Sequence, residues 1–186
     1  MTLTPYVSAT QTIETSRLLL REWRDEDLEP FSRMNADERV CEFLEKTLTP
    51  EETRAMVERN RADFQEQGFG LWAVEVKHGP AFIGYTGLGV PSFQAHFTPC
   101  VEIGWRLAYA HWGKVYATEA AQAVLSHAFT RLGIAGIVAL TVPNNRRSRA
   151  AMEKIGMTRD LNGDFDHPEL PPDHPFSRHV LYRIGR

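Results

Sequence analysis

The residues best suited to chemistry lie between Val101 and Met157. A turn follows a long predicted strand there and opens a predicted helix; its sequence is Trp112-Gly113-Lys114-Val115-Tyr116-Ala117. The first N–H groups of a helix have no partners within the helix, and together with the helix dipole they attract an anion such as phosphate. One crossover later, the polar loop Asn145-Arg146-Arg147-Ser148 opens a second helix. This order of elements predicts a site for a phosphate-bearing ligand.

The turn is not a Walker A phosphate loop. That motif requires G-x-x-x-x-G-K-[ST], whereas Lys114 is followed by Val115 and no glycine stands at the required offset. For the turn taken alone, a solvated helix N-terminus that binds nothing is an alternative. The arginines at positions 146, 147 and 149 suit the phosphate of a nucleotide better than RNA, because three arginines are too few to indicate nucleic-acid binding.

A second group of polar residues lies near the end of the chain. The run 164–169 with Asp173, His174 and His179 contains side chains that can bind metals. Their spacing matches no zinc pattern and no cysteine takes part. A proline-containing loop rich in turn residues accounts for most of this composition, so we expect no metal.

The composition narrows the class of protein. The 186 residues carry a formal net charge of −3 and a pI near 6.2, which gives no general attraction to nucleic acid. Two cysteines provide no disulfide framework. The chain has neither a signal-peptide pattern nor an apolar run of about 18 residues. We expect a cytoplasmic protein without membrane contacts, a monomer or homodimer, with one domain over residues 13–186 after an N-terminal extension, residues 1–12.

Hydrophobic periodicity predicts a mixed sheet covered by helices, an α/β fold of the α+β kind. Strands are expected at residues 13–23, 69–77, 81–88, 97–107, 134–142, 158–165 and 179–184. Helices are expected after residue 27 and at residues 50–67, 116–132 and 148–155. The three central strands are joined by short loops and are therefore expected to be antiparallel.

Helix boundaries are marked by specific residues. Asp25 is a candidate N-cap for the first helix. Thr49 precedes a proline and stands three residues before Glu52, which is a capping-box pattern. Gly68 and Gly156 follow predicted helices, where glycine is favoured because it adopts a left-handed conformation without strain.

The segment 101–157 resembles the cofactor-binding core of the GNAT N-acetyltransferases, in particular the RimJ/RimL-like branch. The resemblance rests on Trp-Gly-Lys-Val-Tyr-Ala-Thr-Glu at 112–119 and on Asn145-x-x-Ser148 followed by Glu-Lys-Ile-Gly-Met. It extends over nearly the whole chain, starting from residues 14–21. It implies one domain whose mostly antiparallel sheet is splayed at a site for acetyl-CoA. The implied cofactor-binding residues are Trp105, Arg106, Leu107, Trp112, Gly113, Lys114, Val115, Tyr116, Ala117, Thr118, Asn145 and Ser148.

Two positions depart from the family pattern. Val115 stands where the family has a glycine, and a β-branched residue tolerates a positive φ poorly. Met152 stands where many members have a tyrosine that protonates the leaving thiolate. Because methionine has no proton to donate, the acid role is assigned by the resemblance to Ser148 or to a bound water.

Acetyl transfer to an amine requires a neutral amine, and a carboxylate near the acceptor can remove its proton. Glu102, on the strand before the expected splay, is the leading candidate for this base. The alternative is a structural glutamate that faces solvent or pairs with an arginine. By resemblance to the family, contacts with the acceptor are expected from Glu42, Phe43 and Leu44 and from the loop with Asp166 and His167.

The resemblance implies an acetyl-CoA-dependent N-acetyltransferase that uses a primary amine, either a protein N-terminus or a small molecule, in a ternary complex. A non-catalytic CoA-binding or regulatory domain is the competing hypothesis, and Val115 and Met152 favour it. A third hypothesis is an interaction domain unrelated to CoA, whose stability would not change when the cofactor is added.

Overall fold

The computed structural model describes residues 12–186, and within them one sheet of eight strands. The expected N-terminal extension lies outside the described residues except for Thr12. The strand order is β1-β2-β3-β4-β5-β6-β8-β7, and every neighbouring pair is antiparallel except the parallel pair β5–β6. The strands are β1 (Ile13–Glu14), β2 (Leu18–Arg21), β3 (Leu71–Val76), β4 (Gly84–Gly89), β5 (Glu102–Leu107), β6 (Gly136–Thr141), β7 (Thr158–Asp166) and β8 (Arg178–Gly185).

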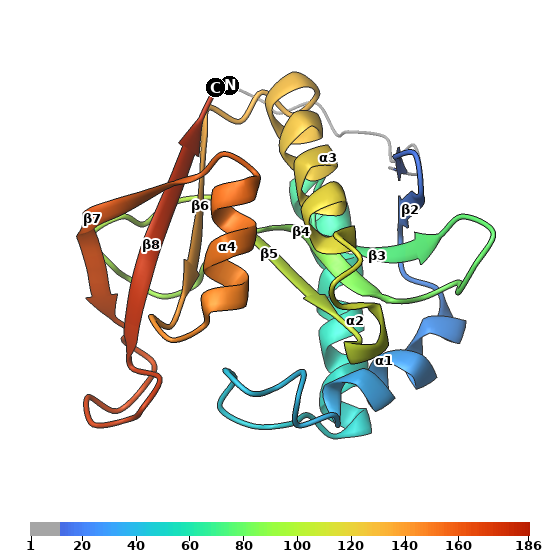
Figure 1. The fold of residues 1–186 in the computed structure, drawn as a ribbon, viewed down its shortest axis with the longest axis horizontal. Coiled ribbons are helices and arrows are strands. Elements are labelled where there is room, and N and C mark those ends of the chain that lie inside the picture. Colours follow the sequence, from blue (N-terminus) through green and yellow to red (C-terminus); the bar gives the residue numbers. More distant parts are fainter. Residues whose placement is uncertain (1–11) are drawn as a thin grey trace.

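The helices cover both faces of this sheet (Figure 1). They are α1 (Leu28–Asn35), α2 (Pro50–Gln67), α3 (Tyr116–Thr130) and α4 (Arg146–Lys154), with two short 3₁₀ helices, η1 (Asp25–Asp27) and η2 (Tyr109–His111). The predicted capping box of α2 is confirmed: Thr49 Oγ1 accepts from Glu52 N at 3.2 Å, and Glu52 Oε2 accepts from Thr49 N at 2.8 Å. No helix of residues 12–186 combines the length and the apolarity that crossing a bilayer needs.

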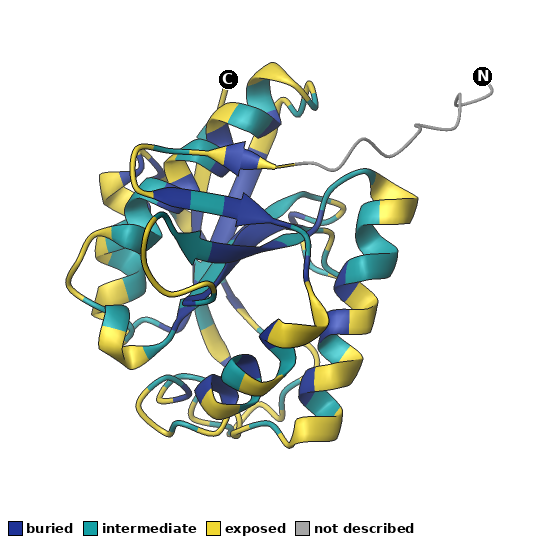
Figure 2. Ribbon diagram, turned by 90° about the vertical axis from the view of Figure 1, so that its right-hand side faces the viewer, coloured by how far each residue is buried: buried dark blue, intermediate teal, exposed yellow. Residues whose placement is uncertain are grey.

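Two apolar cores lie on opposite faces of the sheet, because successive side chains of a strand point to opposite sides. On β3, Trp72 packs into the core beneath α3, whereas Ala73 belongs to the core beneath α1 and α2. Tyr85 of β4 also lies on the α1–α2 side, with Trp23 and Phe31. Figure 2 shows the buried residues concentrated in the central strands and the exposed residues on the outer sides of the helices.

Three predicted boundaries were wrong. The strand expected at 13–23 is interrupted by a turn in which Thr15 N donates to Leu18 O, so it forms β1 and β2. The strand expected from residue 97 begins at Glu102, because Pro99 cannot donate to a ladder and Phe97 packs in a separate cluster.

The third error concerns the start of the first helix. Arg24, and not Asp25, occupies the N-cap position of η1, which leads into α1. The capping carboxylate is that of Asp27, which accepts from Arg24 N at 2.8 Å and is buried in an ion pair with Arg21. Asp25 is exposed and pairs with Arg61. The pair Arg21–Asp27 ties the start of α1 to β2, so α1 is held firmly against the sheet.

The sheet opens between β5 and β6. These strands pair at the single position Glu102↔Val138, whereas β4 pairs with β5 along the whole of β5, and β8 with β6 along the whole of β6. Figure 1 shows the two halves of the sheet separating where β5 leaves β6. Val101 O accepts from Val138 N at 2.9 Å, so the backbone groups of every second residue after it, including Trp105, point into the gap.

The turn before α3 has an unusual backbone. Gly113 and Val115 both have positive φ, of 75° and 66°. Val115 is the N-cap of α3, and its side chain makes no capping hydrogen bond, so no side chain satisfies the first N–H groups of the helix. Valine therefore takes the conformation for which glycine is suited, and the turn stores strain.

Replacing Val115 by glycine should raise the free energy of unfolding by up to about 1 kcal/mol. A left-handed conformation costs an L-residue about 1–2 kcal/mol, and the larger backbone entropy of glycine offsets about 0.5–1 kcal/mol of that. Urea unfolding measures the change. Val90→Gly is the matched control, because Val90 is similarly exposed (46% against 54%) and lacks a positive φ. If Val90→Gly raises the free energy of unfolding as much as Val115→Gly does, the turn at Val115 is not strained.

Candidate active site

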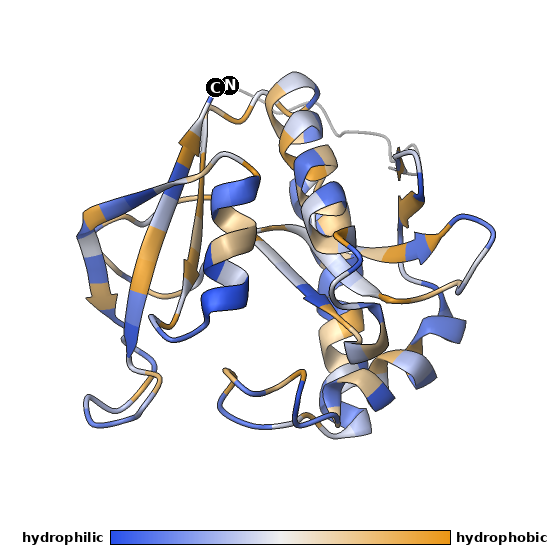
Figure 3. Cartoon of the chain, viewed as in Figure 1, coloured by the Kyte–Doolittle hydropathy of each residue, from blue (hydrophilic) through white to orange (hydrophobic). Residues whose placement is uncertain are grey.

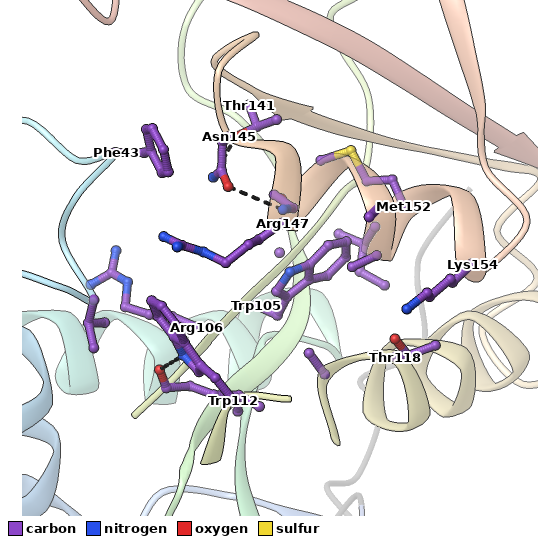
Figure 4. A pocket seen from close by; sticks show the side chains of 18 of the residues that line it. Phe43, Trp105, Arg106, Trp112, Thr118, Thr141, Asn145, Arg147, Met152 and Lys154 are labelled. Atoms are coloured by element: carbon purple, nitrogen blue, oxygen red, sulfur yellow. Dashed lines mark hydrogen bonds between the residues drawn. The ribbon is translucent and has the colours of Figure 1, made fainter. Parts of the chain in front are cut away.

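A cavity of 680 Å³ lies where β5 and β6 diverge. It is lined by both strands, the turn before α3, the first turn of α3, α4 and the segment 40–44 between α1 and α2 (Figure 4). The residues predicted from the sequence to bind donor or acceptor or to act in catalysis that line it are Phe43, Leu44, Glu102, Trp105, Arg106, Leu107, Trp112, Gly113, Val115, Tyr116, Ala117, Thr118, Asn145 and Ser148. The fold therefore brings together the two motifs and the expected base.

Four predicted residues do not line the cavity. The side chain of Lys114 is exposed, and its backbone carbonyl accepts from Arg17 Nη1 at 3.1 Å. Glu42 is turned to an ion pair with Arg147. Asp166 and His167 were expected to contact an acceptor, but Asp166 is exposed and pairs with Arg178 at 3.3 Å, and the ring of His167 packs 4.6 Å from that of Phe93.

One end of the cavity can bind phosphate. The N–H groups of Tyr116, Ala117 and Thr118 open α3 there without a side-chain cap, and such groups favour an anion. Lys154 of α4 lines the same end and faces Thr118 in Figure 4. Glu119 in the first turn would repel an anion, but Arg17 pairs with it at 2.6 Å and neutralises its charge.

Helix α4 forms the opposite wall. Asn145 is its N-cap: Asn145 Oδ1 accepts from Ser148 N at 3.1 Å, and Asn145 Nδ2 donates to Thr141 Oγ1 at 3.0 Å. One N–H of this amide is left for a ligand. The hydroxyl of Ser148 has no hydrogen-bond partner among residues 12–186 and lies at the cavity wall. Figure 3 shows that α4 is hydrophilic at both ends, where its basic residues stand.

Glu102 lies at the point where the two strands part. Its carboxyl is half-buried beside the apolar residues of the cavity, and this desolvation raises the pKa of Glu102 to about 7. No ion pair with Glu102 occurs in the part of the chain that the structure describes. Of the two structural alternatives, a glutamate that pairs with an arginine is therefore not supported, whereas the half-buried side chain keeps partial contact with solvent. A carboxylate with a pKa near 7 is suited to accept a proton at neutral pH.

Met152 is buried, 2% exposed, and also lines the cavity. It supplies no proton, as the sequence predicted. Hydroxyl groups that line the cavity belong to Ser148 of α4 and Thr118 of α3, and to Thr141 and two tyrosines.

Two further lining residues, Arg147 and His179, were named from the sequence, but their contacts were not predicted. Arg147 crosses the mouth of the cavity, with its guanidinium carbon 4.4 Å from the centre of the Trp112 ring and an ion pair to Glu42. His179 of β8 reaches the cavity beside β6; its Nδ1 lies 3.1 Å from Ser177 O, and desolvation lowers the pKa of the imidazole. These contacts depend on distant segments of the chain, so no local pattern signals them.

Among residues 12–186 no group of three or more His, Cys, Asp or Glu side chains is arranged to hold a metal ion. The histidines of the tail are used in packing: the rings of His167 and His179 are 5.2 Å apart, and the ring of Phe165 lies next to both.

Similar proteins are known in sequence and in structure. Residues 17–158 match the acetyltransferase (GNAT) domain family. YnaD of Bacillus subtilis, named as an N-acetyltransferase, is 31% identical over 149 residues, which are 80% of this chain and 83% of YnaD. A GNAT-family acetyltransferase from Bacillus anthracis has a similar structure, with a TM-score of 0.78, 29% identity and coverage of 94% of this chain and 98% of that one.

The fold is also that of RimL, the ribosomal L7/L12 α-N-protein acetyltransferase, whose structure contains coenzyme A. The TM-score is 0.76 at 17% identity, over 94% of this chain and 98% of RimL. With the splayed sheet and the uncapped turn before α3, these matches establish that the chain belongs to the GNAT acetyltransferase family.

Proposed function

We propose that this protein is an acetyl-CoA-dependent N-acetyltransferase that transfers the acetyl group to a primary amine in a ternary complex. One observation carries the proposal: the anion-binding turn, the unpaired edge of β5 and a carboxylate with a raised pKa meet in one cavity. Acetyl-CoA has the matching parts, a diphosphate, an extended amide-containing arm and a thioester. The two cysteines are free thiols, in keeping with a cytoplasmic location.

The donor is held by this chain's backbone more than by its side chains. The N–H groups of residues 116–118 would bind the diphosphate, and Lys154 would add a charge-assisted contact. The arm would pair with β5 as an added strand, because the backbone groups of Trp105 point into the gap. The N–H of Trp105 would then polarise the thioester carbonyl.

The chemistry is a direct displacement. Glu102 takes a proton from the acceptor ammonium, directly or through water, and the free amine forms a C–N bond with the acetyl carbon. The C–S bond breaks, and the thiolate receives a proton from the hydroxyl of Ser148 or from a water that Ser148 holds. The acetylated nitrogen loses its second proton through water, which restores the proton of that donor, and Glu102 returns the first proton to solvent. Neither Cys41 nor Cys100 is needed, since no covalent enzyme intermediate forms.

The competing function, a CoA-binding domain without catalysis, is favoured by Met152, which leaves the site without a tyrosine acid. The two functions are separated by incubating the protein with acetyl-CoA and a panel of amines while thiol release and the melting temperature are recorded. Thiol release that depends on the amine supports the enzyme. A rise in melting temperature without turnover on any amine supports the binding domain, and the absence of both contradicts CoA binding.

The pH profile should depend on Glu102. Because its pKa is about 7 and the base must be deprotonated, log kcat should rise with a slope of one below pH 7 and level off above it. Glu102→Gln should lower kcat at pH 8 by about 10²–10⁴-fold and remove the break. Glu45→Gln, an exposed glutamate outside the cavity, is the control. If the change of slope near pH 7 persists in Glu102→Gln, or if its position moves with the pKa of the amine, Glu102 is not the base.

Ser148→Ala should lower kcat by about 100-fold, the lower end of the contribution of a positioned acid, because water replaces the hydroxyl poorly. The KM for acetyl-CoA should stay within about threefold, since the backbone N–H at position 148 and its cap on Asn145 are kept. Initial rates of thiol release give both constants. Ser126→Ala, on the exposed side of α3, should change neither. An unchanged kcat in Ser148→Ala would assign the proton to another group.

A further inference from the structure

Arg106 is a positive charge at the cavity wall that no carboxylate of the described residues 12–186 balances. Within residues 12–186 it makes one hydrogen bond, from Nη1 to Asn35 Oδ1 at 2.8 Å, and a cation–π contact in which its guanidinium carbon lies 5.5 Å from the centre of the Tyr85 ring. Arg106 is partly buried, as is Arg159, and Arg21 is buried; of these three, Arg21 and Arg159 each pair with an aspartate. Removing a guanidinium from water is costly unless an anion compensates it.

The Arg106 side chain is held in place by buried neighbours. Asn35, at the end of α1, is 0% exposed, and its Nδ2 donates to Thr53 Oγ1 of α2 at 3.1 Å. The amide therefore has a fixed orientation that presents Oδ1 to Arg106. A guanidinium has five N–H donors, and four of the five on Arg106 have no partner within residues 12–186. A rigid fork of this kind matches a carboxylate in a bidentate arrangement.

The location of Arg106 indicates that it contacts the acceptor and not the donor. Arg106 is opposite Tyr85 in the β4–β5 register, so both side chains lie on the α1–α2 face of the sheet. Glu102 is four residues earlier on the same strand and shares that face. Ile103 and Leu107 point the other way, into the core under α3, whose N-terminus forms the phosphate-binding end. Arg106 is therefore placed for the molecule that approaches Glu102.

We propose that the amine acceptor carries a carboxylate and that Arg106 binds this carboxylate while Glu102 receives the proton of the amine. The inference rests on the proposed function and names its class of substrate, an amino acid or a peptide with an acidic side chain next to its N-terminus. Glu102 and Arg106 are separated by four strand residues, or about 13 Å between Cα atoms, so both ends of one small molecule can be held. The wall around them, Val40, Phe43 and Leu44, suits an apolar body.

Matched acceptors that differ in one negative charge test the proposal. The pairs are leucine and leucinamide, phenylalanine and phenylalaninamide, and the amidated dipeptides Ala-Asp and Ala-Asn. For each, kcat/KM is expressed per concentration of neutral amine, because amidation lowers the pKa of the α-amine. The wild-type enzyme should prefer the charged member of at least one pair by about 10- to 100-fold, which is the typical contribution of a charge-assisted hydrogen bond. The amino-acid pairs and the dipeptide pair distinguish the two sources of the carboxylate.

Arg106→Gln should abolish this preference by raising the KM for the charged acceptor, while the KM for its neutral partner and for acetyl-CoA stays within about threefold. Arg106→Lys should retain part of the preference, because it keeps the charge and loses the fork. Arg131→Gln, at an exposed arginine outside the cavity, should retain all of it. If Arg106→Gln does not fold, the proposal is tested by the wild-type enzyme alone, through the ratio of kcat/KM for charged and neutral acceptors.

Two results would overturn the inference and leave the proposed function intact. The first is acetylation of charged and neutral members with equal kcat/KM. The second is a rise in the KM for acetyl-CoA, and not for the acceptor, in Arg106→Gln, which would assign Arg106 to the donor. Failure of the function itself has a different signature, because no amine of either kind would then release thiol.

Discussion

The separation of β5 from β6 is the constraint on which the rest of the molecule depends. The two strands pair with each other only at Glu102↔Val138. On its other side each strand is fully paired, β5 with β4 and β6 with β8. A sheet normally hides its backbone groups in hydrogen bonds. Here an unpaired edge lines the cavity, where a ligand can complete it.

The two halves of the sheet bring different groups to this opening. The β5 half contributes the strained turn and the N-terminus of α3, and the β6 half contributes α4 with Ser148. The charged groups lie in two regions of the cavity, with the unpaired N–H groups of α3 and Lys154 of α4 at one end and Glu102 with Arg106 on the other face of β5. One cavity can therefore receive an anionic donor from one side and an acceptor from the other without bringing their charges together.

Local patterns predicted the parts of the structure whose causes are local. The capping box at Thr49 set the start of α2, and the glycine at 68 ended it with φ of 76°. The motif at 112–118 was placed in the cavity because its residues are contiguous and open a helix. The contacts of Arg106 and His179 could not be predicted from local patterns, because their neighbours belong to distant segments: α1 for Arg106, and the strands beyond β5 for His179. Asp166, for which an acceptor contact was predicted, lies outside the cavity, because aromatic packing sets the path of the tail.

The contact between α3 and the hairpin formed by β1 and β2 (residues 13–21) has a consequence for the proposed cofactor site. Arg17 Nε donates to Glu119 Oε2 at 2.6 Å, and the hydroxyl of Thr15 donates to Oε1 of the same carboxylate. The turn between β1 and β2 thus neutralises a charge in the first turn of α3, beside the N–H groups proposed to bind the diphosphate. By thermodynamic reciprocity, if the contact of residues 13–21 with α3 favours donor binding, then donor binding stabilises that contact by the same free energy. Slower amide exchange over residues 13–21 would therefore report donor binding from outside the cavity.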